Sequence, residues 1–227
     1  MRSLIESCDV YYYQMAERLG IDKLEQFAKA CGFGAPTGID LPHEKSGLVP
    51  SKSWKRRRFG EPWHRGETLN VSIGQGFTLV TPVQVAVFVS SLMNGGKLLK
   101  PSLLLDEPTI VKGTTPMTTQ GRKLVMEAMR LTVATDAGTA KVLRRPDAVL
   151  GGKTGTAQVV RIVGEERLKV EQMAYEHRDH AWMASWGEKD GKRYVVVCML
   201  EHGGHGGSAA GPVVKRVYDK LFGEYRP

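Results

Sequence analysis

The stretch GGKTGTAQVV, residues 151–160, combines small residues with one lysine and two threonines. Two glycines come first and the alternating run AQVVRIV, residues 157–163, follows, so the pattern predicts a turn that leads into a β-strand. Lys153 would then project near the start of this strand. Thr154 and Thr156 would share one face of the strand, because successive side chains of a strand alternate.

These residue types suit a site for an anionic ligand. The hydroxyls of Thr154 and Thr156 can donate to a carboxylate, while the Lys153 ammonium supplies positive charge. Gly155 has no side chain, which lets a ligand approach the backbone between the threonines. The letters KTG also occur by chance, so a solvated lysine at a strand entrance is the alternative interpretation of the motif by itself.

The composition is that of an ordinary globular protein. The chain has 227 residues, of which 41% are hydrophobic and 25% charged, enough for one sizeable core. Its longest apolar runs, VQVAVFV and YVVVCML, are too short to cross a bilayer, and no signal peptide opens the sequence, so we expect this chain by itself to be soluble. Its three cysteines are far apart and predict neither a disulfide framework nor a paired-cysteine metal motif.

The net charge of +8 leaves an acidic partner open. The clearest basic cluster is KSWKRRRFGEPWHR, residues 52–65, which suits nucleic acid, acidic lipid or an acidic polymer. No nucleic-acid motif accompanies it. We therefore favour a solvated loop here and expect no nucleic-acid partner.

The order of predicted elements indicates an α+β fold with an antiparallel sheet flanked by helices. Thr81 and Pro82 mark the start of one helix, and EKDGKR, residues 188–193, reads as a hairpin turn between two strands. Residues 34–80 are predicted to form a long surface loop. A loop of this length is usually functional or held in place by contacts with the rest of the protein. The expected helices are 3–20, 22–34 with Asp22 as the N-cap, 81–96, 118–133 and 211–224, and the expected strands are 157–163, 181–188 and 193–201.

A second short motif precedes the first. Ser7 and Asp9, in SCD, can both face one cleft if the backbone turns irregularly there, although most Ser-x-Asp motifs are helix caps. Serine β-lactamases and penicillin-binding proteins use Ser-x-x-Lys, then Ser-x-Asn, then Lys-Thr-Gly. In this chain Ser-x-Asp precedes Lys-Thr-Gly, with a helical region between them and a sheet after. The flanks SCDVYYYQMAERLGIDKLEQFAKACGFGAPTGIDLPHEKSG, SIGQGFTLVTPVQVA and GGKTGTAQV closely resemble the transpeptidase domain of class B penicillin-binding proteins of the cell-elongation type, over essentially the whole chain.

The chain departs from that family's pattern in one large respect. No serine is followed three residues later by lysine, and Ser53 with Arg56 comes nearest. In the family this nucleophile motif lies upstream of Ser-x-Asp. We therefore expect residues 1–227 to be the C-terminal part of a single transpeptidase domain, with a serine β-lactamase/DD-transpeptidase-like fold that is incomplete at the N-terminus and inactive by itself. Asp9, where relatives carry Asp or Asn, is a mild departure.

The resemblance implies a role for each matching residue. Lys153 would provide charge in the cleft and support proton transfer, and Ser7 would relay a proton to the leaving amine. Asp9 would orient the peptide. The hydroxyls of Thr154 and Thr156 would hold the terminal carboxylate of a stem peptide ending in D-Ala-D-Ala, and the Thr156 N–H would be one oxyanion-hole donor.

The resemblance also implies partners and a location. The parent protein would cross-link peptidoglycan stem peptides through a serine acyl-enzyme that β-lactams trap. It would be anchored in the cytoplasmic membrane with this domain in the periplasm or extracellular space. A membrane glycosyltransferase and other elongation-complex proteins would be its partners.

No cofactor is expected for this chain. Some elongation-type relatives bind zinc through the cysteine at Cys8 together with upstream residues, so zinc is implied only for a full-length protein. His202 and His205 form a His-x-x-His pair, but they lie in a glycine-rich connection without further ligands nearby.

Two other functions remain open from the sequence. A nucleophile-free ligand-binding or scaffold module of the same fold would keep the carboxylate pocket and lack the serine. A hydrolytic β-lactamase is the third possibility, and IGQGFTLVTPVQ argues against it because this segment matches the transpeptidases.

Overall fold

The computed structural model describes residues 1–159 and 172–223, and its chain forms two compact units. The first unit comprises residues Met1–Glu6 and Met126–Pro227, and the second comprises Ser7–Val125. Each unit is described by itself below. No helix within the described ranges is long and apolar enough to span a membrane.

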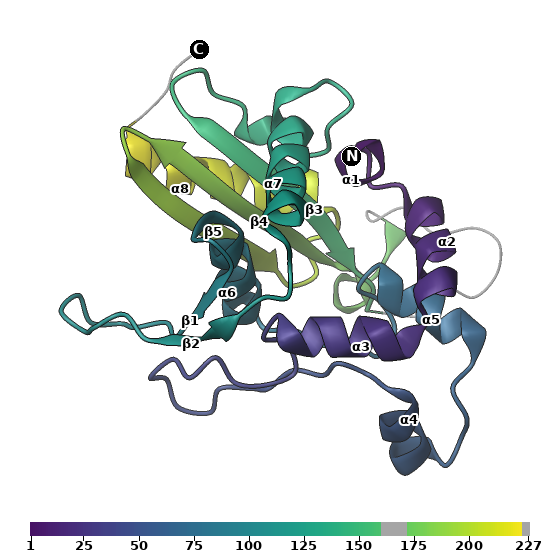
Figure 1. Cartoon of the computed structure of the whole chain (residues 1–227). Coiled ribbons are helices and arrows are strands. Elements are labelled where there is room, and N and C mark those ends of the chain that lie inside the picture. Colours follow the sequence, from purple (N-terminus) through teal and green to yellow (C-terminus); the bar gives the residue numbers. More distant parts are fainter. Residues whose placement is uncertain (160–171, 224–227) are drawn as a thin grey trace. The chain divides into compact units, whose positions relative to one another are not determined.

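The first unit is built on a three-stranded antiparallel sheet in the order β3-β4-β5 (Figure 1). Its strands are β3 (Val149–Ala157), β4 (His180–Lys189) and β5 (Lys192–Leu200). The terminal helix α8 (Gly211–Phe222) packs on β4 and β5. The predicted α+β class with an antiparallel sheet and flanking helices is confirmed, as is the hairpin turn at Asp190 and Gly191.

The core of this unit lies between the sheet and α8. Tyr218 of α8 is fully buried, and its hydroxyl lies 3.1 Å from the Ser185 hydroxyl of β4. The Ser185 hydroxyl in turn donates to the Val196 carbonyl of β5 at 2.7 Å. The remaining buried residues of the cluster are Val133, Ala140, Leu143, Leu150, Ala181, Met183, Ala210, Val214 and Phe222.

The first strand of the sheet lies earlier in the sequence than predicted. We expected a strand at 157–163, but β3 ends at Ala157, and Gln158 and Val159 lie outside any strand. Residues 160–163 of that prediction fall outside the described residues. The glycine pair is therefore part of the strand rather than a turn before it.

Packing explains why glycines occupy this strand. A Cβ on Gly151 would lie 2.4 Å from the indole of Trp186, a buried residue of β4 directly opposite. A Cβ on Gly152 would lie 3.1 Å from Leu143. The side chains of neighbouring elements fill the space that these two positions leave empty.

The second unit is mainly helical and contains a small two-stranded sheet. The helix expected over 3–20 is interrupted at Glu6–Cys8, and the next helix begins at Ile21 after the N-cap Gly20, so Asp22 lies in its first turn and is not the cap. The elements of the unit are α2 (Asp9–Leu19), α3 (Ile21–Ala30), α4 (Lys52–Phe59), α5 (Arg65–Ser72), α6 (Pro82–Met93), β1 (Lys97–Leu99) and β2 (Val111–Thr114). Helix α1 (Arg2–Ile5) belongs to the first unit, and α7 (Thr119–Ala134) runs from the second unit into the first.

Helix α6 starts as predicted, with Thr81 as N-cap and Pro82 at the first position. Thr81 and Gln84 cap each other: the Thr81 hydroxyl accepts from the Gln84 N–H at 3.2 Å, and the Gln84 side-chain oxygen accepts from the Thr81 N–H at 2.9 Å. The Gln84 amide nitrogen also donates to the carbonyls of Ala35 and Ser46, at 2.8 Å each. One buried side chain therefore fixes the helix start and holds part of the long segment before it.

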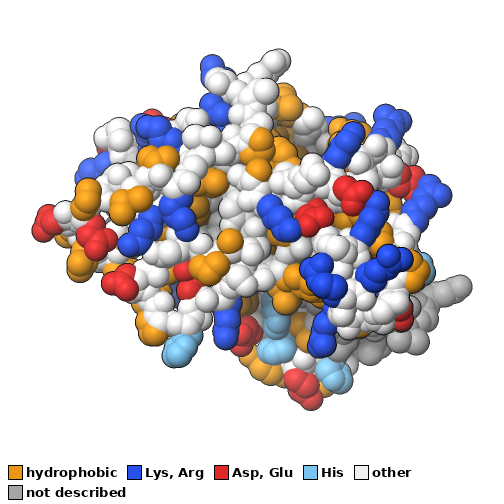
Figure 2. Space-filling model, turned by 60° about the horizontal axis from the view of Figure 1, so that its bottom comes forward, with side chains coloured by type: hydrophobic (Ala, Val, Ile, Leu, Met, Phe, Trp, Pro, Cys, Tyr) orange, Lys and Arg blue, Asp and Glu red, His pale blue; other side chains and the backbone are white. Residues whose placement is uncertain are grey.

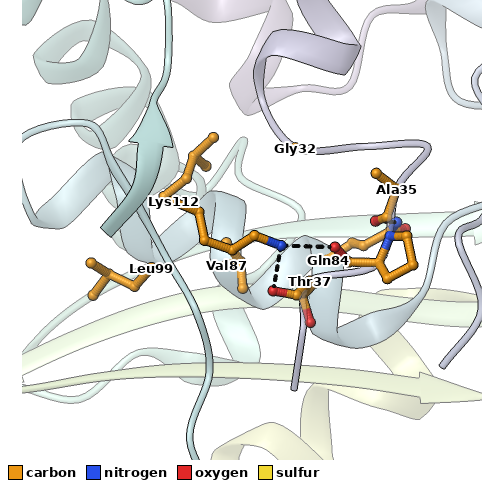
Figure 3. Close-up of a pocket in the computed structure, with 9 residues that line it drawn as sticks. Gly32, Ala35, Thr37, Gln84, Val87, Leu99 and Lys112 are labelled. Atoms are coloured by element: carbon orange, nitrogen blue, oxygen red, sulfur yellow. Dashed lines mark hydrogen bonds between the residues drawn. The ribbon is translucent and has the colours of Figure 1, made fainter. Parts of the chain in front are cut away.

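The long segment over residues 34–80 is held in place by polar contacts, and it contains helices α4 and α5. The Lys112 ammonium of β2 donates to the Thr37 carbonyl at 2.9 Å and to the Pro36 carbonyl at 3.1 Å, beside a pocket of about 190 Å³ (Figure 3). The Glu44 carboxylate accepts from the N–H and the hydroxyl of Thr37. The basic cluster at 52–65 is likewise helical for most of its length, not a solvated loop.

Candidate functional site

Lys153 lies in the middle of β3, opposite Ala184 of β4. We expected Lys153 at the start of a strand. That position is wrong, although Lys153 does lie in a strand of the sheet. Its side chain is half-buried, and its ammonium donates to the Thr154 carbonyl at 2.8 Å. Residues of β3 both precede and follow Lys153 along the chain, and strand pairing fixes its backbone more firmly than a turn would.

Thr154 and Thr156 follow on the same strand, two residues apart, and therefore on one face. The Thr154 hydroxyl donates to the Thr139 hydroxyl at 2.9 Å. Sequence reasoning missed Thr139, because no spacing rule connects it with Thr154. Its position follows from the adjacent Gly138, where a Cβ would lie 2.0 Å from the Thr132 carbonyl oxygen, so the chain can turn back tightly after α7.

Strand β3 is an edge strand of its sheet. It pairs with β4 on one side, and within the described ranges no strand pairs with its other side. An edge strand presents backbone donors and acceptors along which an extended peptide can add. The motif residues Lys153 to Thr156 thus lie where a peptide ligand could align.

The glycine-rich connection after β5 packs tightly against this motif. A Cβ on Gly206 would lie 2.1 Å from the Trp182 carbonyl oxygen and 2.6 Å from the Gly155 carbonyl oxygen. The neighbouring Gly207 would bring a Cβ within 3.6 Å of the Thr154 methyl group. The glycines therefore let this connection pack closely against β3 and β4.

The other predicted site residues lie in the second unit, at its beginning. Ser7 joins α1 to α2 with φ of +54°, a left-handed conformation that is uncommon for a residue with a side chain. Cys8 is the N-cap of α2, and Asp9 is the exposed first residue of that helix. The irregular turn expected around Ser7 is present, and Ser7 is not the helix cap.

The described residues provide no metal site. They contain no group of three or more His, Cys, Asp or Glu side chains that could hold an ion, and Cys8 is exposed. His202 makes structural contacts instead: its N–H donates to Nδ1 of His180 at 3.0 Å, and its own Nδ1 lies 3.1 Å from the Arg178 carbonyl oxygen. The residues present do not fit zinc, and the absence of a cofactor stays a prediction.

Fold and motif together are those of a serine transpeptidase-type α+β domain, and comparison with known proteins agrees. A family model described as penicillin binding protein transpeptidase domain matches residues 1–219. The chain therefore belongs to the penicillin-binding protein transpeptidase family, as its motifs predicted.

Within this family the chain is similar to penicillin-binding protein 2. It is 32% identical to the peptidoglycan D,D-transpeptidase MrdA of Haemophilus influenzae, an alignment that covers all of this chain and 36% of the relative. PBP2 of Pseudomonas aeruginosa in complex with WCK 5153 superposes with a TM-score of 0.82 at 31% identity, over 99% of this chain and 48% of that one. PBP2 of Helicobacter pylori in complex with MreC gives 0.80 at 33% identity, over 97% and 39%.

The chain thus spans about a third of the length of its curated relative. The TM-scores of 0.80 and 0.82 against the two PBP2 structures confirm the predicted fold family. That residues 1–227 form part of one single domain stays a prediction, as do the individual roles of Ser7, Asp9, Lys153 and the two threonines.

Proposed function

We propose that the protein carrying this chain is a peptidoglycan D,D-transpeptidase of cell-wall elongation. The observation that carries the proposal is the family match over residues 1–219 with the Lys-Thr-Gly-Thr motif intact on an edge strand. This chain contributes the substrate-binding strand and the Ser-x-Asp turn. The nucleophilic serine comes from outside the 227 residues, because no Ser-x-x-Lys occurs among them.

The substrate aligns with β3 as an added strand. The hydroxyls of Thr154 and Thr156 donate to the terminal carboxylate of a D-Ala-D-Ala stem, and the Lys153 ammonium balances its charge. In this structure the Thr154 hydroxyl donates its single proton to the Thr139 hydroxyl at 2.9 Å, so this proton turns from Thr139 to the carboxylate when substrate binds.

The reaction is acyl transfer in two steps. The serine oxygen attacks the carbonyl carbon of the penultimate alanine, and the Thr156 N–H donates to the resulting oxyanion. The proton that the attacking serine hydroxyl loses is relayed through Ser7 to the terminal D-alanine nitrogen as the bond to that nitrogen breaks, leaving an acyl-enzyme. An amine of a neighbouring stem then attacks the ester carbonyl, and the proton it loses returns to the serine oxygen as the ester bond breaks. This step forms the cross-link and regenerates the serine.

The proposed partners and location follow from this reaction. The domain acts outside the cytoplasmic membrane, in the periplasm or extracellular space, with the parent protein anchored in that membrane. β-Lactams acylate the same serine. A membrane glycosyltransferase supplies nascent glycan strands, and a scaffold protein of the elongation complex positions the enzyme; the PBP2 of Helicobacter pylori solved with MreC supports a partner of this kind.

Labelling of the full-length protein with a fluorescent penicillin tests the proposal. We expect one covalent adduct per molecule, on a serine outside this sequence, and cross-linked dimers when stem pentapeptides are supplied. Absence of both the adduct and the cross-linked product would refute it.

A second function is favoured by one observation, the missing Ser-x-x-Lys. If the full-length protein also lacks this motif, the chain is part of a nucleophile-free module that binds stem peptides through β3 without turning them over. In that case stem peptides bind reversibly and intact-mass analysis finds no penicillin adduct.

A further inference from the structure

Helix α4 (Lys52–Phe59) carries three consecutive arginines in its last turn, on the surface of the second unit. Arg56, Arg57 and Arg58 are all exposed. Within the described part of the chain, Arg56 and Arg57 have no acidic partner. In Figure 2, Lys and Arg side chains gather on the right of the drawn face, on the side where Figure 1 shows α4. This surface therefore keeps uncompensated positive charge.

A buried lysine fixes the segment that follows α4. Lys55 is only 2% exposed, and its ammonium lies 2.5 Å from one carboxylate oxygen of Glu67 in α5 (Arg65–Ser72). The other oxygen of Glu67 accepts from the His64 N–H at 2.7 Å. The pKa of Glu67 is lowered despite its partial burial, by these hydrogen bonds and by the Lys55 charge. The connection between α4 and α5 is thus held at both ends.

This connection places an aromatic wall beside the cations. The indole N–H of Trp63 donates inward to the Thr68 hydroxyl at 2.8 Å, and the side chain remains half-buried. The polar edge of the indole is therefore occupied, and its apolar ring is what remains for a ligand. A cleft of about 500 Å³ opens here, lined by Lys52, Ser53, Arg56, Pro62 and Trp63.

The two cations of the cleft differ in their surroundings. Lys52 already forms an exposed ion pair with Asp22 at 2.6 Å, which competes only weakly with a ligand because surface pairs contribute little. Arg56 lines the cleft without such a partner in the described ranges. A guanidinium can donate two parallel hydrogen bonds to a carboxylate, so Arg56 is suited to recognise that group.

We propose that this cleft binds an acidic saccharide, with the sugar ring on Trp63 and its carboxylate on Arg56 and Lys52. The indole supplies a flat apolar surface and the cations supply charge complementarity. A concave cleft with one aromatic wall suits a discrete sugar unit better than a flat lipid surface, and a nucleic acid would need a longer row of phosphate contacts.

We assign the saccharide as a glycan strand of the cell wall that carries no stem peptides (stem-free glycan). In such a strand the lactyl carboxylate of N-acetylmuramic acid is free. This choice of source rests on the proposed function, whereas the ring-and-carboxylate chemistry does not. The binding residues are separate from Ser7, Asp9 and the motif of β3. The stem-free strand in the cleft is a different strand from the one whose stem peptide β3 receives, because a lactyl group that bears a stem has no free carboxylate.

Calorimetric titration of the full chain with stem-free glycan, prepared by amidase digestion of peptidoglycan, tests the proposal. Such glycan lacks stem peptides, so it cannot report binding at β3. Chitin oligosaccharides of equal length have the same rings without carboxylates and serve as the neutral probe. We expect the glycan to bind and chitin to bind at least about tenfold more weakly, as expected when hydrogen bonds to a charged group are lost.

Two variants of the same helix separate the cleft from the general charge. Arg56→Gln should weaken glycan binding about tenfold or more, because it removes the bidentate donor. Arg57→Gln removes the same charge one residue away, outside the lining of the cleft, and should change binding by less than about threefold. Both residues are exposed, so neither substitution should disturb folding.

Several outcomes would overturn the proposal: no glycan binding, equal losses in the two variants, or tighter binding to phosphatidylglycerol vesicles or to oligothymidylate than to the glycan. Penicillin labelling of the full-length protein distinguishes this failure from failure of the proposed function. Normal labelling without glycan binding refutes only the cleft, and glycan binding without labelling refutes only the transpeptidase.

Discussion

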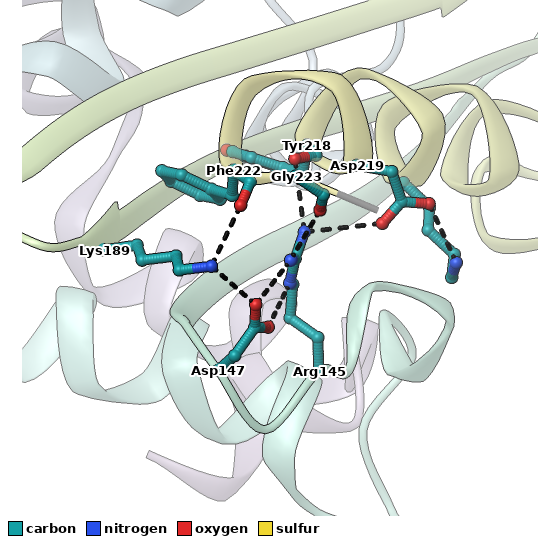
Figure 4. A network of polar contacts seen from close by, with 8 residues as sticks. Arg145, Asp147, Lys189, Tyr218, Asp219, Phe222 and Gly223 are labelled. Atoms are coloured by element: carbon teal, nitrogen blue, oxygen red, sulfur yellow. Dashed lines mark hydrogen bonds and ion pairs between the residues drawn. The ribbon is translucent and has the colours of Figure 1, made fainter. Parts of the chain in front are cut away.

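Arg145 and Asp147 form a two-point ion pair just before β3, with Nε 2.6 Å from Oδ1 and Nη2 2.7 Å from Oδ2 (Figure 4). Arg145 also donates to the carbonyls of Tyr218 and Gly223 at the end of α8, at 3.2 and 3.0 Å. The Lys189 ammonium, at the end of β4, donates to Asp147 at 2.8 Å. One polar network therefore joins the strand that carries the Lys-Thr-Gly motif to the neighbouring strand and the terminal helix.

Asp147→Asn should destabilise the first unit. Arg145 is 8% exposed, so the substitution weakens the compensation of a nearly buried charge, and we expect the free energy of unfolding to fall by about 1.5–3 kcal/mol. Urea unfolding followed by tryptophan fluorescence measures this change. Asp136→Asn is the matched control, because Asp136 pairs with Arg144 at 3.2 Å but is 93% exposed, and it should change stability by less than about 0.5 kcal/mol. Equal effects would show that the network adds nothing beyond a surface pair.

The same carboxylate predicts a pH dependence. Hydrogen bonds from Arg145 and Lys189 hold the pKa of Asp147 well below its usual range. A lowered folded-state pKa stabilises the fold fully above the unfolded value of about 3.9, and this contribution is lost as the pH falls below it. The stability difference between the wild type and Asp147→Asn should therefore be constant from about pH 7 to pH 5 and shrink below about pH 4. A difference that stayed constant to pH 2.5 would contradict the lowered pKa.

Lys153→Ala in the full-length protein should abolish acylation by a fluorescent penicillin, because it removes the positive charge on β3 that the proposed site uses. Gel fluorescence at equal protein concentration measures the labelling. Lys192→Ala, in the hairpin of the same sheet, is the control and should label normally. Unchanged labelling of Lys153→Ala would make Lys153 an ordinary strand residue.

Gly151→Ala should destabilise the protein by about 1–3 kcal/mol, because the added methyl group overlaps the buried Trp186 indole, 2.4 Å away. Gly113→Ala, in β2, is the matched strand glycine with open space around it, and should be neutral or slightly stabilising. Thermal unfolding of both variants decides the question. A neutral Gly151→Ala would mean that Trp186 can move aside and that packing does not fix the glycine.

The 227-residue chain by itself should not react with penicillin. Covalent catalysis needs a nucleophile activated by a neighbouring base, and no serine here has a lysine three residues later. Intact-mass analysis after incubation with penicillin is the measurement, with a full-length relative as the positive control. A stoichiometric adduct on any serine of this chain would overturn both the proposed external nucleophile and the proton-relay role of Ser7.

The sequence by itself determined the elements whose signals are local. Thr81 and Pro82 set the start of α6 because a capping hydroxyl and a proline act within one helical turn. Asp190 and Gly191 set the β4–β5 hairpin because both adopt positive φ, which this pair tolerates. The family was also readable from the sequence, since the order of short motifs does not depend on how they pack.

Only the tertiary structure decided where β3 lies and how the site residues are held. Alternation favoured the run after Ala157, yet the strand formed over the glycines, because β4 lies opposite them and Trp186 fills the space beside Gly151. The contact of Thr139 with Thr154 and the burial of Lys55 likewise depend on how elements distant in the sequence pack together. Local patterns report preferences of neighbouring residues, whereas strand pairing and burial are set by residues distant in the sequence, whose packing energies override those preferences.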